Sequence, residues 1–99
     1  MARPDLLEEQ DLKIYLEQVP EWSRENNSIV REFVCSNFTS VIGLVNSIAI
    51  LAEKFDHHPN IYIYGWNKLR VTLSTHDRGG LTTLDFDLAK EIETIKVNI

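Results

Sequence analysis

Apolar residues recur at helical spacing in three separate stretches of the chain. The spacing predicts a first helix from about Asp5 to Gln18, a central helix from about Asn37 to Lys54, and a last helix after Thr82. Either Ser36 or Asn37 can cap the start of the central helix. Its periodic apolar positions are Phe38, Val41, Ile42, Val45, Ile48, Ala49 and Ala52. Stripes of this kind are typical of helices that bury one face.

Two pairs of polar residues have the spacing of a capping box, in which two side chains bind each other's backbone at a helix start. Asp5 and Glu8 have this spacing before the first helix, with aspartate in place of the usual serine or threonine. Thr82 and Asp85 have it before the last helix. Pro20 ends the first helix, because proline cannot continue one.

Three further stretches have the composition of β-strands, namely Ile29 to Cys35, Ile61 to Trp66 and Leu69 to Thr75. In the third stretch apolar and polar residues alternate, which predicts a strand with one face in water. Gly65 to Lys68 is the expected hairpin turn, although Trp66 is an unusual turn residue. The polar run Ser23 to Ser28 predicts a loop or a further short strand near Trp22.

The order helix, strand, helix, strand, strand, helix predicts an α+β fold, with helices packed on one face of a mainly antiparallel sheet. A chain of 99 residues is long enough for one domain spanning residues 1–99 and too short for two. The segment Ile61–Tyr64 carries no charge, and as a free sheet edge it would promote aggregation unless it pairs with another strand. We therefore expect a homodimer or homotetramer formed by strand-to-strand pairing. The apolar arc of the central helix is widened by Leu44, Ile50 and Leu51. We expect either another subunit or the other helices to cover these three side chains.

Composition excludes several classes of protein. The chain is 43% hydrophobic and 25% charged, as in an ordinary soluble globular protein. A net charge of −5 without a block of lysine or arginine argues against direct binding of nucleic acid or anionic lipid. The longest apolar stretch, Val41 to Ala52, contains polar residues and is short for a membrane span, and the N-terminus has no signal-like core. We therefore expect a cytoplasmic protein that does not bind membranes.

The single cysteine, Cys35, permits no internal disulfide, which agrees with a reducing compartment. Cys35 lies in an apolar, strand-like run. This setting favours a buried structural thiol over a reactive one.

All three histidines lie within the stretch Glu53 to Asp85. His57 and His58 precede Pro59, and His76 follows a predicted strand and precedes a Gly-Gly turn. Two bends of the chain can therefore bring the three imidazoles together. They can be loop residues, zinc ligands, or an acid and base for proton transfer.

The chemistry of imidazole bears on these three alternatives. Adjacent histidines rarely point at one ion, and no HExxH spacing is present, which argues against zinc. An unperturbed pKa of about 6.5 lets one imidazole be charged and another neutral at pH 7, which suits proton transfer on a neutral substrate. Ser74 and Thr75 directly precede His76, but strand alternation points neighbouring side chains to opposite faces, so no nucleophilic triad is predicted.

The spacing of these residues resembles the signature of the pterin-4a-carbinolamine dehydratases. It consists of Glu53-x-x-x-His57-His58-Pro59, an aromatic residue at Trp66, His76 after nine more residues, Gly79-Gly80-Leu81-Thr82, and Asp85. The resemblance implies dehydration of 4a-hydroxytetrahydrobiopterin to quinonoid dihydrobiopterin, a step in tetrahydrobiopterin recycling. It implies a pterin substrate and histidine acid/base catalysis, with neither a metal nor another cofactor. Trp66 lacks the hydroxyl of the tyrosine that many members carry.

The resemblance also implies roles for individual residues. His57 and His76 would exchange protons with the substrate, and His58 would bind the pterin or assist the transfer. The further residues implied around the substrate are Trp22, Glu53, Pro59 and Asp85.

Three of these four residues have an alternative structural role. Trp22 can wall the pocket or anchor the core. Glu53 can orient an imidazole or be a solvated charge. For Asp85 the capping-box spacing favours a helix cap, which would fix where His76 points.

The family also implies a second class of function. Its members form dimers and, in animals, tetramers, and some assist a homeodomain transcription factor. Other relatives have lost catalytic histidines and serve as assembly factors. A non-catalytic interaction protein, coactivator-like or an assembly factor, is therefore the alternative to the enzyme, although retention of all three histidines favours catalysis.

Overall fold

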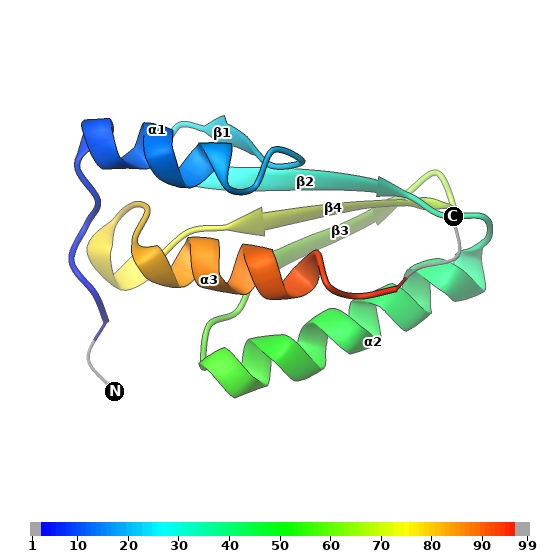
Figure 1. Cartoon of the computed structure of the whole chain (residues 1–99). Helices are drawn as coiled ribbons and strands as arrows, with labels where there is room; N and C mark the ends of the chain where they lie inside the picture. The colour runs from blue at the N-terminus through cyan, green and yellow to red at the C-terminus, as the bar shows by residue number, and fades with distance from the viewer. Residues whose placement is uncertain (1–2, 97–99) are drawn as a thin grey trace.

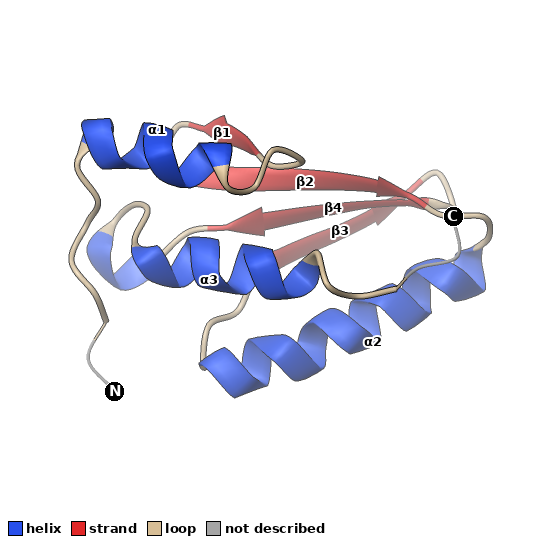
Figure 2. Ribbon diagram, in the orientation of Figure 1, coloured by secondary structure: helices blue, strands red, loops and turns tan. Residues whose placement is uncertain are grey.

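The computed structural model describes residues 3–96, which form a four-stranded antiparallel sheet with helices on one of its faces (Figures 1 and 2). In chain order the elements are α1 (Glu9–Glu17), β1 (Ser23–Glu25), β2 (Ser28–Val34), α2 (Phe38–Phe55), β3 (Asn60–Tyr64), β4 (Lys68–Leu73), the short 3-10 helix η1 (His76–Arg78) and α3 (Thr83–Ile92). The strands lie in the order β1-β2-β4-β3. The predicted α+β fold is confirmed, and the short strand near Trp22 is present as β1.

The central strands pair so that apolar side chains share the face beneath the helices. Ile29 of β2 lies opposite Leu73 of β4, and Phe33 lies opposite Leu69. On β4, Leu69, Val71 and Leu73 are fully buried and alternate with half-buried polar residues. The period of two predicted for this strand is confirmed, and the strand has one face in the core.

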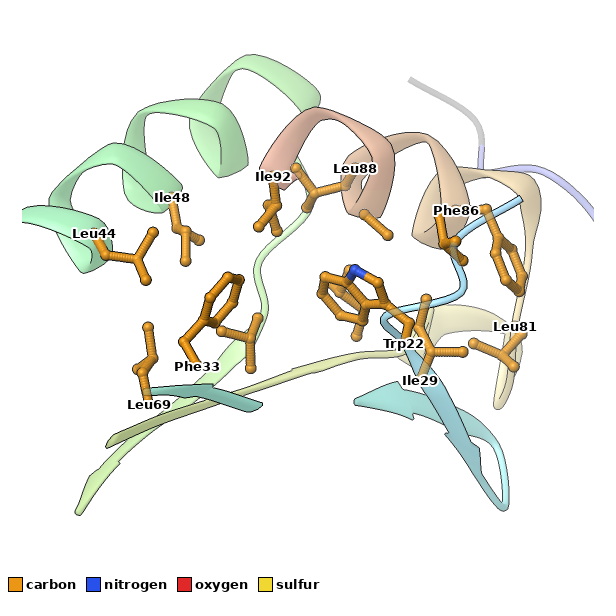
Figure 3. Close-up of a cluster of buried hydrophobic side chains, with 14 of the residues drawn as sticks. Trp22, Ile29, Phe33, Leu44, Ile48, Leu69, Leu81, Phe86, Leu88 and Ile92 are labelled. Atoms are coloured by element: carbon orange, nitrogen blue, oxygen red, sulfur yellow. The ribbon is translucent and has the colours of Figure 1, made fainter. Parts of the chain in front are cut away.

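The core fills the space between the sheet and the three helices (Figure 3). The central helix α2 contributes Val41, Leu44, Ile48 and Ala52 from one face. Its opposite face stays in water, where Ile50 is 72% exposed. Leu44 is therefore covered by the protein's own chain, whereas Ile50 is not.

In residues 3–96, α2 is the one helix with the length and hydropathy of a membrane span, at 18 residues and a mean hydropathy of 1.4. The length argument from Val41 to Ala52 underestimates this helix, which runs on to Phe55. Its Leu44 and Ile48 side chains pack in the core beside Leu69 and Phe33 (Figure 3). The core thus accounts for the apolar residues on one face of α2, whereas Phe38, Ile42 and Ile50 remain exposed.

The first helix begins later than its sequence predicts. It starts at Glu9 with Glu8 as N-cap and no side-chain capping bond, so the predicted capping box of Asp5 and Glu8 is wrong. The preceding residues are held in an extended path instead, because the Leu7 N–H donates to the Leu81 carbonyl at 2.9 Å. Contacts with distant parts of the chain outweigh the local capping spacing here.

The turn between β3 and β4 is built on two residues with left-handed backbone conformation, Gly65 and Trp66, both at φ of 56°. Tyr64 pairs with Lys68, so the loop has three residues, 65–67, of which the first two have this conformation. Trp66 is 63% exposed there. It lies at the opposite end of the hairpin from the residues that precede β3 and follow β4.

Cys35 is 3% exposed and belongs to the core. Burial raises the pKa of its thiol, because the thiolate would lose its hydration. The predicted structural thiol agrees with both observations.

The contrast between Ile48 and Ile50 generates a first prediction. Ile48→Ala leaves a cavity beneath α2 and should lower the free energy of unfolding by about 2–5 kcal/mol. In the absence of a subunit on the exposed face of α2, Ile50→Ala, two residues away, should change it by no more than about 0.5 kcal/mol. Urea denaturation of both variants at two protein concentrations makes the comparison. An equal loss in both variants would mean that Ile50 is covered in solution by another subunit.

Candidate active site

The chain turns sharply after α2 and carries His57 into the interior. Asp56, the C-cap of α2, has left-handed φ and ψ of 49° and 45°. The His57 N–H then donates to the Ala52 carbonyl at 3.0 Å, which closes the helix end. His57 is only 5% exposed, and its Nε2 lies 2.6 Å from Oδ1 of the fully buried Asp85.

The second oxygen of Asp85 is also saturated with hydrogen bonds. Its Oδ2 accepts the Thr75 hydroxyl at 2.8 Å and the Thr82 N–H at 2.9 Å. The Thr75 and Thr82 hydroxyl oxygens lie 2.8 Å apart. Because the Thr75 proton goes to Asp85, the Thr82 hydroxyl donates to Thr75. Every polar side chain of this small network is buried and paired.

Asp85 therefore has two roles through one carboxylate. The capping box with Thr82 at the start of α3 is present, as the sequence predicts. The same side chain also binds His57 directly. The expectation that Asp85 fixes His76 is wrong in detail, because its contact on that strand is with Thr75, the residue before His76. The sequence offers helix cap and site carboxylate as alternative roles for Asp85. In the structure one carboxylate has both contacts.

The network determines which ring nitrogen of His57 carries a proton. As a carboxylate, Asp85 only accepts hydrogen bonds, so Nε2 of His57 donates to it. In the neutral imidazole the other nitrogen, Nδ1, is then unprotonated. His57 is thus held as a ring with one nitrogen committed and one available for proton exchange.

The other two histidines are exposed. His58 Nε2 lies 2.5 Å from Glu53 Oε2, in a pair whose side chains are 60% and 76% exposed. Glu53 thus orients an imidazole, one of its two expected roles, although water screens this pair strongly. His76 begins η1 immediately after Thr75.

A pocket of about 190 Å³ brings these groups together. The loop after α2 contributes His57 and His58, and the end of β4 with η1 contributes His76. The remaining lining residues are Arg3, Ser74, Thr75 and Asp77. Histidines from two separate segments of the chain therefore line one cavity, as the two predicted bends suggest. The cavity is smaller than those that enclose a whole drug-sized ligand, so a bicyclic ring would enter it by one edge.

The structure puts the other expected site residues elsewhere. Trp22 is 4% exposed and lies within the core (Figure 3). Its indole N–H donates to Glu93 Oε2 at 2.9 Å. This arrangement favours the core anchor over the pocket wall for Trp22. Pro59 is half-buried and, like Glu53 and the exposed Trp66, is absent from the pocket lining.

Four pocket residues, Arg3, Ser74, Thr75 and Asp77, are not among the site residues predicted from the sequence, and two of them are informative. Thr75 has a usable signal, because the period of two puts it on the buried face with Leu73, where a hydroxyl needs a partner. Arg3 has no such signal, since it lies 54 residues before His57 with no element between Arg3 and α1 to predict its position. Its contact with the pocket is visible only in the folded chain.

No group of three or more His, Cys, Asp or Glu side chains within residues 3–96 is arranged to hold a metal ion. His57 is committed to Asp85 and His58 to Glu53. What the arrangement offers chemically is a set of imidazoles at different exposures around one cavity. Such a set can donate and accept protons at neighbouring positions.

The committed nitrogen of His57 generates a second prediction. In long-range ¹H–¹⁵N NMR spectra, neutral His57 should carry its proton on Nε2. In Asp85→Asn the amide oxygen should replace Oδ2, which accepts two donors, and the amide NH₂ should face His57. An amide donor there requires Nε2 to accept, so the proton should move to Nδ1. The exposed His76 should be unchanged in the variant, and an unchanged His57 tautomer would contradict the assignment.

The comparisons with known proteins identify the family of this chain. A family model described as "Pterin 4 alpha carbinolamine dehydratase" matches residues 5–95. A protein of Chloroflexus aurantiacus named "Putative pterin-4-alpha-carbinolamine dehydratase" is 48% identical over 89 residues, covering 90% of this chain and 95% of that protein. The predicted family is therefore confirmed.

Two solved structures share the fold. One, described as a "transcriptional coactivator/pterin dehydratase from Brucella Melitensis", has a TM-score of 0.83 at 31% identity and covers 89% of this chain and 95% of its own. The other, described as "a pterin dehydratase-like protein as a RuBisCO assembly factor", has a TM-score of 0.60 at 18% identity, covers 74% and 83%, and shows the fold alone. By sequence over residues 5–95 and by fold, this chain belongs to the pterin 4 alpha carbinolamine dehydratase family.

Proposed function

We propose that the protein dehydrates 4a-hydroxytetrahydrobiopterin to quinonoid dihydrobiopterin and water. The observation that carries the proposal is the buried His57–Asp85 hydrogen bond of 2.6 Å at the edge of a cavity that His58 and His76 also line. A buried, oriented imidazole beside two exposed ones supplies proton acceptors and donors at one site. The names of the relatives point to the same class of substrate.

The reaction requires two proton movements. The bond between C4a and its hydroxyl breaks, and the hydroxyl leaves as water once it has gained a proton. N5 loses its proton, and its electron pair forms the C4a=N5 double bond. One acid and one base balance the reaction, and no electron leaves or enters the substrate.

The tautomer of His57 suggests which of the two proton transfers this residue performs. Its Nδ1 is available as a base, and Asp85 stabilises the imidazolium that forms when the proton arrives. His76, exposed on the other side of the cavity, is the partner that exchanges the second proton. His58, held by Glu53, binds the pterin or assists the transfer. We also propose that Pro59 shapes the loop that carries the two neighbouring histidines.

These roles generate a third prediction. His57→Ala and His76→Ala should each lower kcat/KM by roughly 100-fold or more, the range usual for a positioned acid or base. Gln10→Ala, on the exposed surface of α1, is the control and should keep full activity. The assay follows dehydration of chemically generated 4a-hydroxytetrahydropterin by absorbance. Wild-type rates in both histidine variants would refute the mechanism.

Two additional results of the same assay separate the rival functions. No acceleration by the pure wild-type protein would favour a non-catalytic interaction protein, coactivator-like or an assembly factor. Loss of activity after treatment with a chelator, recovered on adding a divalent metal, would favour a metal-dependent lyase. We expect acceleration that chelators leave unchanged, because one histidine can donate the proton that the hydroxyl needs and another can accept the proton that N5 loses.

We place this activity in tetrahydrobiopterin recycling in the cytoplasm. The single cysteine, free and buried, suits a reducing compartment.

We further propose that the protein is a homodimer joined along β3, or a tetramer of such dimers. β3 is an edge of the sheet and carries no charged side chain over its five residues, Asn60–Tyr64. Its backbone groups on the free side are available to a second copy. The exposed apolar side chains Phe38, Ile42 and Ile50 of α2 provide a second surface for the tetramer.

The dimer generates a fourth prediction. Wild-type protein at micromolar concentration should sediment at a multiple of the 11.4 kDa chain mass. Tyr62→Lys places like charges near each other across the paired edges and should shift the equilibrium toward monomer. Ile14→Lys, at an exposed position of α1, is the matched control and should sediment as the wild type. A wild-type protein that is monomeric at all concentrations would refute the proposal.

A further inference from the structure

Arg3 lies at the edge of the histidine pocket, although it is far from the histidines in sequence. The extended segment before α1 brings it there. The Arg78 guanidinium of η1 donates from Nε to the Pro4 carbonyl at 3.1 Å and from an Nη to the Arg3 carbonyl at 2.9 Å. The Leu7 N–H bond to Leu81 holds the other end of the segment. The backbone of Arg3 is thus fixed beside the pocket.

The Arg3 side chain is held much more loosely than its backbone. Its Nε lies 3.5 Å from Asp77 Oδ2, and one Nη lies 3.7 Å from Asp56 Oδ2. Both distances exceed those of good charge-assisted hydrogen bonds. Its Nη1 is enclosed and has no hydrogen-bond partner within residues 3–96. For comparison, Arg24 donates to both oxygens of Glu9 at 2.7 and 3.0 Å.

A guanidinium in this condition is placed for a ligand. An enclosed charged donor without an acceptor is costly, and a guanidinium can only donate. The group that completes it must therefore be an acceptor, and because Arg3 lines the histidine pocket, a ligand in that pocket can supply one. Nη1 is enclosed as the side chain lies, so the guanidinium would reach such an acceptor by rotating. The two ion pairs, both longer than hydrogen bonds, oppose such a rotation only weakly.

The charges around Arg3 indicate which kind of acceptor fits. Asp56 and Asp77 flank the guanidinium, and their side chains are 67% and 69% exposed. Two carboxylates beside one cation leave no excess positive charge for a phosphate. A neutral oxygen, such as a ring carbonyl, accepts a hydrogen bond without adding to the negative charge.

We propose that Arg3 is a substrate-binding residue that donates a hydrogen bond to the C4 carbonyl oxygen of the pterin. This inference rests on the proposed function, since that carbonyl is bonded to C4a, the carbon that loses its hydroxyl beside the histidines. Arg3 orients the ring and takes no part in the proton transfers. It therefore acts on binding and leaves the chemical step to the imidazoles.

The test separates binding from chemistry in the full-length protein. Arg3→Met keeps the length of the side chain and removes its donors. It should raise KM for 4a-hydroxytetrahydropterin roughly tenfold or more and change kcat less than about threefold. Arg3→Lys keeps the charge but loses the planar guanidinium, so its KM should lie between those of the wild type and Arg3→Met. Arg24→Met, which loses an ion pair away from the pocket, is the control and should match the wild type.

A binding experiment makes failure of this inference distinguishable from failure of the proposed function. Biopterin, an oxidised fluorescent pterin that keeps the C4 carbonyl, should bind Arg3→Met roughly tenfold more weakly than the wild type in a fluorescence titration. Turnover by the wild type with unchanged KM and biopterin affinity in Arg3→Met would overturn the role of Arg3 alone. Biopterin binding that depends on Arg3 without turnover would overturn the proposed function alone. Neither binding nor turnover by the wild type would overturn both.

Discussion

The hydrogen bond between His57 and Asp85 is the interaction on which the rest of the site depends. It joins the loop after α2 to the start of α3, two points 28 residues apart in the chain. The Asp85 carboxylate is fully buried and binds three groups, the His57 ring, the Thr75 hydroxyl and the Thr82 N–H. Removing any one of them leaves a buried polar group without its partner. The pocket takes its shape from this constraint.

One consequence is that stability and activity share a residue. The carboxylate that starts α3 is also the group that determines the tautomer of His57. A change that spoils the cap also misorients the imidazole. An amide at this position preserves much of the packing but offers a donor where an acceptor is needed. The exposed pair of His58 and Glu53 has no such double role and tolerates more change.

Much of the fold follows from periodicity. The alternation on β4 and the stripe on α2 each predict one buried face, because burial of apolar area dominates the position of both elements. Prediction fails where long-range contacts decide the local structure. The start of α1 depends on the bond of Leu7 to Leu81, and the position of Arg3 depends on Arg78, 75 residues away. Local sequence around Asp5 or Arg3 contains no trace of either partner.

The site, like the fold, has features that the sequence predicts and features that depend on long-range contacts. The convergence of the three histidines follows from the two bends, whereas the choice of His57 as the buried one depends on its pairing with Asp85 and could not be read from adjacent, identical residues. Trp22 is instructive for a different reason. Resemblance to the family suggested a pocket wall, but an indole N–H that binds Glu93 inside the core needs no ligand to satisfy it.

The two tryptophans occupy opposite environments, with Trp22 at 4% exposure and Trp66 at 63%. Indole emission depends on the polarity around the ring, so the native protein contains one blue-shifted and one red-shifted fluorophore. Unfolding changes the surroundings of Trp22 far more than those of Trp66. The intrinsic fluorescence of this chain is therefore mainly a probe of how the sheet and α3 are packed at the core, with the hairpin turn contributing a nearly constant background.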